Sequence, residues 1–132
     1  ENKKQQYTLD LIKSKNEDEE KIEILSNLRK MGVQIAWVTN SIEMTAKQML
    51  ISSGIMLFVD LLVHNKSVKN NKPHPEPYIK AMVLANSLPE ETLIVEDSEV
   101  GLHAAMLTGA EIWKVKDSSE VTWENFRNKY IK

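Results

Sequence analysis

The chain has 132 residues, of which 42% are hydrophobic and 27% charged, and its formal net charge is −2 at pH 7. This length suits one compact domain, and the near-neutral charge does not favour a nucleic-acid partner. The absence of cysteine excludes disulfides and thiolate chemistry, and no apolar run is long enough to span a membrane. We therefore expect a cytoplasmic protein without membrane attachment.

The first 20 residues are mostly polar, lack a signal-peptide pattern and open without methionine. These features suggest a piece of a longer protein. We interpret residues 1–20 as a polar lead-in or the remnant of a linker, and residues 21–132 as an α/β core. The acidic run over residues 17–20 favours the first turn of a helix. Apolar side chains at helical spacing continue this helix to Gly32, which would cap it.

Strands and helices alternate through the rest of the chain. The apolar run over residues 33–38 predicts a buried parallel strand. Asn40, with Glu43 three residues later, matches a capping box that would begin a helix ending near Gly54. The other predicted elements are a strand near 58–63, a helix over about 76–86, a strand at 93–95, a helix from Ser98 to Gly109, a strand at 112–115 and a helix over 121–130. This alternation predicts a Rossmann-like, three-layer α/β domain with a parallel sheet.

Two adjacent carboxylates, Glu96 and Asp97, follow the short apolar strand over residues 93–95. Ligands of open α/β sheets bind at the carboxyl ends of the strands, and Mg²⁺ prefers oxygen ligands of this kind. Ser98 is a natural cap for the next helix, and the free N–H groups at a helix start can receive an anion. The sequence therefore predicts a place where magnesium and phosphate could meet.

Two other segments carry polar groups that suit a phosphate. Thr39 and Asn40 end the first predicted strand, so parallel topology places them on the same sheet edge as Asp97. Lys72 precedes a helix, which leaves either edge open to it, but its long loop gives it room to reach the carboxyl edge. A hydroxyl, backbone N–H groups and an ammonium would together form a phosphate cradle.

The three segments together resemble motifs of the haloacid dehalogenase superfamily, in the form seen in β-phosphoglucomutase-like phosphatases. The matching segments are Val38-Thr39-Asn40-Ser41, Lys72-Pro73-His74-Pro75 with Tyr78, and Val95-Glu96-Asp97-Ser98 with Gly101, Ala104 and Ala105. The resemblance covers roughly residues 20–117. It implies a magnesium-dependent phosphatase for a small phosphorylated metabolite, in which Thr39 and Asn40 bind the phosphoryl group, Lys72 stabilises its charge, and Glu96 and Asp97 hold Mg²⁺.

The family's first motif, an apolar strand that ends in Asp-x-Asp, has no match in this chain. In the family, the first of these aspartates attacks phosphorus to form an aspartyl-phosphate, which water then hydrolyses. The resemblance therefore implies that the nucleophile and one central strand come from sequence outside this chain, with residues 1–20 a remnant of the cap or linker between. By itself, the chain is expected to be inactive.

Other interpretations remain open. A non-catalytic binding or scaffold domain could keep the fold without the nucleophile, and a phosphomutase would differ from a phosphatase in cap residues outside this sequence. Each segment alone also has a simpler explanation, for example a solvated charge at Lys72 or a plain strand-end turn at Glu96-Asp97. The three histidines, His64, His74 and His103, lack the spacing of a zinc site and are predicted to be structural or exposed.

Overall fold

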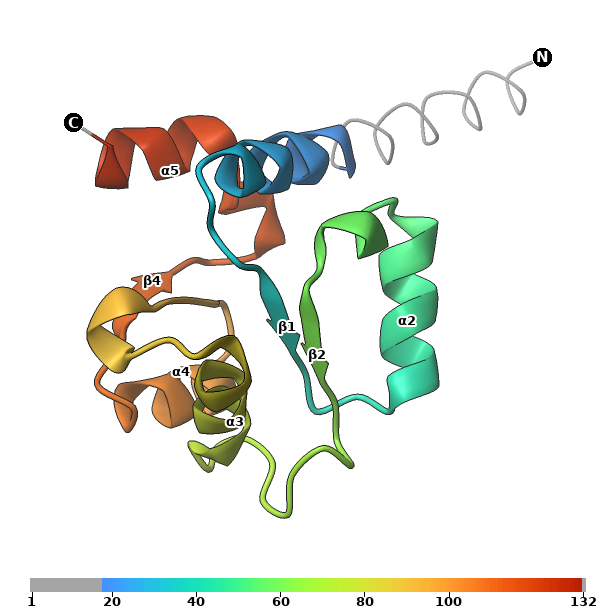
Figure 1. The fold of residues 1–132 in the computed structure, drawn as a ribbon, viewed down its shortest axis with the longest axis vertical. Coiled ribbons are helices and arrows are strands. Elements are labelled where there is room, and N and C mark those ends of the chain that lie inside the picture. The colour runs from blue at the N-terminus through green and yellow to red at the C-terminus, as the bar shows by residue number, and fades with distance from the viewer. Residues whose placement is uncertain (1–17, 132) are drawn as a thin grey trace.

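A computed structural model describes residues 18–131, which begin with a helix over residues 18–30 (Figure 1). Gly32 follows this helix with φ +83°, the left-handed conformation that glycine adopts at low cost after a helix. The elements that follow are β1 (Ala36–Val38), α2 (Glu43–Ser52), β2 (Leu61–Val63), α3 (Glu76–Ala85), β3 (Leu93–Glu96), α4 (Glu99–Met106), β4 (Glu111–Lys114) and α5 (Trp123–Tyr130). Short 3₁₀ turns lie at Met56–Phe58, Pro89–Glu91 and Ser118–Glu120.

The four strands form two parallel pairs. β1 pairs with β2, with Trp37 beside Leu62, and β3 pairs with β4, with Val95 beside Trp113. Within residues 18–131, β1 and β3 are not hydrogen-bonded to each other. The prediction of an α/β fold with parallel strands is confirmed, but the sheet is divided into two pairs rather than continuous.

Helices cover both faces of the β3–β4 pair. Consecutive strand residues point to opposite faces, and the core divides accordingly. Ile94 packs in one buried cluster with residues of α3 and α4, namely Tyr78, Met82, Ala104 and Ala105. Leu93 and Trp113 pack in a second cluster with the helix over 18–30 and with α5, which lie together in Figure 1. This arrangement is the predicted order of helix, sheet and helix.

Asp60 fastens the first helix to the β1–β2 pair. One carboxylate oxygen lies 2.6 Å from Nη1 of Arg29, and the other accepts a hydrogen bond of 2.8 Å from the backbone N–H of Ile35. The bond from Ile35 and the pairing with Arg29 hold the pKa of Asp60 below its usual value.

None of the helices in the described residues has the length and apolar character needed to cross a bilayer.

Some local predictions differ from the structure. β2 begins at Leu61 rather than near residue 58, because Met56–Phe58 form a 3₁₀ turn. In and just after α4, the larger apolar side chains Val100 and Leu107 are 47% and 59% exposed, whereas Ala104 and Ala105 are fully buried. The small alanine face thus lets α4 approach the strands closely. Residues 1–17, most of the predicted lead-in, lie outside the described residues.

Candidate functional site

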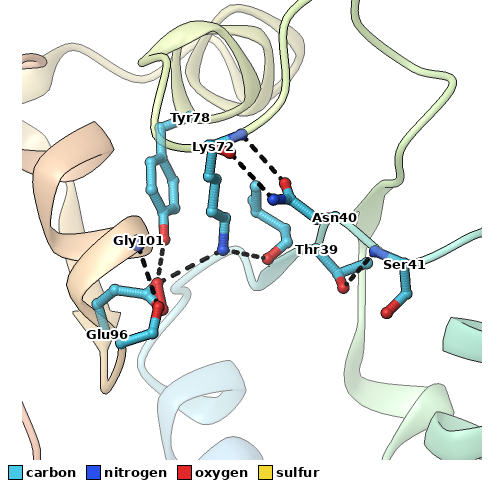
Figure 2. A network of polar contacts seen from close by, with 9 residues as sticks. Thr39, Asn40, Ser41, Lys72, Tyr78, Glu96 and Gly101 are labelled. Atoms are coloured by element: carbon cyan, nitrogen blue, oxygen red, sulfur yellow. Dashed lines mark hydrogen bonds and ion pairs between the residues drawn. The ribbon is translucent and has the colours of Figure 1, made fainter.

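The carboxyl ends of β1 and β3 lie close together, joined by the side chain of Lys72 (Figure 2). The Nζ atom of Lys72 donates to the backbone oxygen of Val38 at 2.9 Å and lies 3.4 Å from Oε2 of Glu96. Both members of the ion pair are shielded from solvent, with side chains 11% and 9% exposed. Of the two sheet edges that the sequence left open to Lys72, its side chain therefore reaches the one at the carboxyl ends of the strands.

Asn40 holds the backbone of Lys72 from both sides. Its Nδ2 donates to the Lys72 carbonyl and its Oδ1 accepts from the Lys72 N–H, each at 3.1 Å. The prediction that Asn40 caps α2 is wrong, because Ile42 occupies the cap position. The amide is committed instead to a loop 32 residues away, which fixes the position from which the Lys72 side chain starts.

Glu96 is 8% exposed, and its carboxylate is held by the residues around it. Besides the ion pair with Lys72, Oε2 accepts a hydrogen bond of 2.6 Å from the hydroxyl of Tyr78. The other oxygen, Oε1, lies 3.4 Å from the hydroxyl of Ser98, which caps α4 as predicted by accepting from the Gly101 N–H. Burial, then the hydrogen bond to Glu96, and then the charges of Glu96 and Asp97 raise the pKa of Tyr78, so its hydroxyl stays a donor.

Tyr78 was not among the predicted site residues. It belongs to the segment Lys72-Pro73-His74-Pro75 with Tyr78 that carries the family resemblance, but the resemblance assigns it no role. One signal was available in the sequence: a hydroxyl in the first turn of a helix that otherwise presents apolar side chains to the core. Buried phenol groups need a hydrogen-bond partner, and this partner is Glu96.

Thr39 and Asp97, the other two predicted site residues, lie outside the hydrogen-bond network that joins Asn40, Lys72 and Glu96. The Thr39 hydroxyl accepts from the Ser41 N–H at 3.0 Å, which shapes the turn after β1. Asp97 follows β3 directly and is exposed. Lys72 thus contacts Asn40 through its backbone and Glu96 through its ammonium. Thr39 and Asp97 lie at the ends of the same strands, with groups that solvent or a ligand could reach.

The histidines stand apart from this site. His64 has Nε2 3.9 Å from Glu43, and Nδ1 of His74 accepts from the Glu76 N–H. His74 and His103 line an open cavity beside the proline-rich loop that does not include Lys72 or Glu96. Across residues 18–131, no three His, Asp or Glu side chains gather closely enough to hold a metal by themselves.

Gly101 is the position where a small change should disturb this site most directly. A Cβ atom on Gly101 would overlap the carboxyl group of Glu96. Replacing glycine by alanine inside a helix normally stabilises by about 1 kcal/mol. Here we expect Gly101→Ala to lower the free energy of unfolding by about 2 kcal/mol, because the side chain must displace Glu96. Urea unfolding followed by tryptophan fluorescence measures the change.

The control for Gly101→Ala is the same substitution combined with Glu96→Ala. Truncating Glu96 removes the overlapping atoms, so the added methyl should no longer destabilise the chain relative to Glu96→Ala alone. If Gly101→Ala stabilises the otherwise unchanged chain, as at an ordinary helical position, the close packing between α4 and Glu96 is wrong.

Comparison with known proteins relates the chain to a family. The family model described as haloacid dehalogenase-like hydrolase matches residues 2–115. The chain belongs to this haloacid dehalogenase-like family. Among curated relatives, it is 37% identical over 98 residues to the pyrophosphatase PpaX of Bacillus mycoides, an alignment that covers 71% of this chain and 46% of the relative. The chain thus spans about half the length of the curated relatives it matches.

Solved structures of haloacid dehalogenase-like proteins share the fold. A subfamily IA hydrolase from Geobacter sulfurreducens is 26% identical with a TM-score of 0.65, over 75% of this chain and 55% of that one. A β-phosphoglucomutase from Clostridium difficile has a TM-score of 0.70 at 21% identity, over 84% of this chain and 55% of that one. The predicted resemblance to the phosphatase branch of this superfamily is confirmed.

Proposed function

We propose that this chain carries most of the active site of a magnesium-dependent phosphate monoester phosphatase, whose nucleophilic aspartate comes from sequence outside it. The observation that supports this best is the position of the Lys72 ammonium, 2.9 Å from the Val38 oxygen and 3.4 Å from Glu96. It lies where β1 and β3 both end. A cation at this edge can neutralise the oxygens of a transferring phosphoryl group.

The residues beside Lys72 would have distinct roles in binding that group. Thr39 follows β1 with a half-buried side chain, and its hydroxyl could turn from the Ser41 N–H to a phosphoryl oxygen. Asn40 would act indirectly, since both of its amide atoms hold the Lys72 backbone. Lys72 would then stabilise the negative charge that develops during transfer, as a fixed electrostatic partner.

Glu96 and Asp97 form a donor set that fits Mg²⁺. This ion is commonly bound by one or two carboxylates and completed by waters and substrate phosphate. Asp97 is exposed, and the one polar contact of Glu96 Oε1 within residues 18–131 is the 3.4 Å approach to the Ser98 hydroxyl. We therefore assign these two carboxylates as the residues that would hold Mg²⁺. The ion would supply charge neutralisation between the carboxylates and the phosphate.

The backbone of the two strand pairs supports a nucleophile from elsewhere. On β3, the oxygens of Thr92 and Glu96 accept from β4 and the residue after it, so the groups of Leu93 and Val95 turn to the opposite edge. On β1, the oxygen of Val38 accepts from Lys72 rather than from a strand. One further parallel strand between β1 and β3 could use these groups, and a carboxylate at its end would face Lys72.

In this proposal, the first carboxylate of Asp-x-Asp on the added strand would attack phosphorus as the bond to the substrate oxygen breaks. That oxygen would take a proton from the second acid of Asp-x-Asp and leave as an alcohol. Water then hydrolyses the aspartyl-phosphate and regenerates the carboxylate. The substrate would be a small phosphorylated metabolite, and the relative named as a pyrophosphatase makes a phosphate anhydride one compound to assay. The alternatives to a phosphatase are a phosphomutase and a scaffold domain that has lost the nucleophile.

The test measures two properties of the chain by itself, with Asp97→Ala as the matched variant. Mn²⁺ serves as a paramagnetic substitute for Mg²⁺. We expect it to bind the unchanged chain and not to bind Asp97→Ala. We expect no magnesium-dependent phosphate release from p-nitrophenyl phosphate, because the nucleophile is missing. A scaffold would bind no metal at this site. Release that Asp97→Ala abolishes would instead assign the nucleophile to an acid in this chain.

A further inference from the structure

Tyr78 places a hydroxyl among apolar side chains. It lies in the first turn of α3, is 6% exposed, and packs with Met82, Ile94 and Ala104. A phenylalanine would fill the same space without burying a polar atom. The hydroxyl therefore has a cost that its single strong hydrogen bond, 2.6 Å to Oε2 of Glu96, must offset.

This hydrogen bond makes the two oxygens of Glu96 unequal. Oε2 is contacted by two donors, the Tyr78 hydroxyl and the Lys72 ammonium. Among the residues that the structure describes, Oε1 has only the long contact of 3.4 Å with the Ser98 hydroxyl. Since each carboxylate oxygen offers about two lone-pair directions, Oε2 is saturated and Oε1 keeps capacity for another ligand. Gly101 lies so close to the carboxyl group that a Cβ atom there would overlap it, which leaves the group little room to move.

The ring of Tyr78 also contacts the cation of the site. Nζ of Lys72 lies 5.0 Å from the ring centroid, within the range of a cation–π contact. One rigid side chain thus touches both the ammonium and the carboxylate, as Figure 2 shows for Lys72, Tyr78 and Glu96. Because the ring is packed in the core, it can fix the positions of both charges relative to α3.

We propose that Tyr78 is a positioning residue that occupies Oε2 of Glu96 and so reserves Oε1 for a divalent cation shared with Asp97. This inference rests on the proposed function, because it assumes that Glu96 and Asp97 hold the metal. Residues that orient metal ligands through hydrogen bonds commonly change metal affinity by about 10- to 100-fold when they are replaced. Removing the hydroxyl should free the carboxylate to turn and to bind a cation less well.

The experiment compares Mn²⁺ binding, measured by electron paramagnetic resonance, in the unchanged chain, Tyr78→Phe and Tyr130→Phe. We expect Tyr78→Phe to raise the dissociation constant about 10-fold. Tyr130→Phe is the matched control, since its hydroxyl is buried without a hydrogen-bond partner among residues 18–131 and lies in the aromatic cluster around Trp113. It should leave the dissociation constant unchanged. Equal affinity in Tyr78→Phe and the unchanged chain would overturn the proposal.

A second measurement tests the hydrogen bond without metal. Tyr78→Phe and Glu96→Gln are made separately and together, and their losses of folding free energy are compared by urea unfolding. We expect the combined loss to be smaller than the sum, because both changes weaken the same bond. Additive losses would overturn the role of Tyr78. If the unchanged chain binds no Mn²⁺, the proposed metal site and this inference both fail. If the unchanged chain binds Mn²⁺ but Tyr78→Phe binds it equally well, the inference fails and the proposed metal site stands.

Discussion

Replacing Lys72 by methionine is expected to lower the free energy of unfolding by about 3 kcal/mol at pH 7, the lower end of the range for breaking a buried ion pair. Methionine keeps the volume but leaves Glu96, with a side chain only 9% exposed, beside an apolar group. The hydrogen bond from Tyr78 would remain, which limits the loss. Urea unfolding followed by the fluorescence of the tryptophans, including the buried Trp113, measures it.

The control for Lys72→Met is Lys47→Met. Lys47 pairs with Glu43 at 2.9 Å, but both side chains are about half exposed and solvent screens the pair. Its removal should cause no measurable loss. Adding Glu96→Gln to Lys72→Met should restore part of the stability, because an amide can accept from Tyr78 without carrying a charge. Equal losses for Lys72→Met and Lys47→Met would mean that the Lys72–Glu96 pair is solvated.

Adding a strand should give the chain phosphatase activity. The addition is a run of β-branched residues that ends in Asp-x-Asp, joined upstream through a flexible linker. We expect magnesium-dependent release of phosphate from p-nitrophenyl phosphate to rise at least roughly 100-fold above background, since even modest enzymes exceed this acceleration. The physical reason is that the strand would pair with the free edges of β1 and β3 and would bring a carboxylate to Lys72.

Two variants of the added strand separate pairing from chemistry. Asn-x-Asn in place of Asp-x-Asp should still raise the melting temperature, because the backbone hydrogen bonds are unchanged, but should give no turnover. An added strand with polar residues in place of the apolar run should give neither effect. Turnover with Asn-x-Asn would mean that the nucleophile is an acidic residue of this chain and not of the added strand. A stable fusion with Asp-x-Asp that remains inactive would favour the scaffold alternative.

The sequence predicted the features of this fold that depend on neighbouring residues. Ser98 caps α4 because its partner, the Gly101 N–H, is only three residues away, and Gly32 ends the first helix for an equally local reason. The order of strands and helices followed from apolar runs of the right length. Parallel pairing then placed the ends of β1 and β3 on one edge, so the positions of Thr39 and Asp97 could be anticipated.

The contacts that make the site could not be read in this way, because they join distant segments. Asn40 matches a local capping pattern, yet its side-chain amide hydrogen-bonds the Lys72 backbone, 32 residues away, instead of capping α2. The edge reached by Lys72 depends on the path of a long loop, which periodicity does not determine. The bond between Tyr78 and Glu96 required knowing that α3 packs against β3. Only the family resemblance, with its spaced motifs, linked these segments beforehand.

The single ammonium of Lys72 also has a consequence for the folding of this chain. Its partners Val38 and Glu96 are 34 and 24 residues away, so both contacts close long loops, and closing them costs chain entropy before any bond is gained. The β3–β4 pairing joins residues 18 apart, such as Leu93 and Glu111, and the β1–β2 pairing joins residues 25 apart, such as Ala36 and Leu61. Both separations are shorter than the 34 residues between Lys72 and Val38, so both pairs can form before that contact closes. Lys72 thus records the docking of two folding units, and its burial should be among the last events when the chain folds.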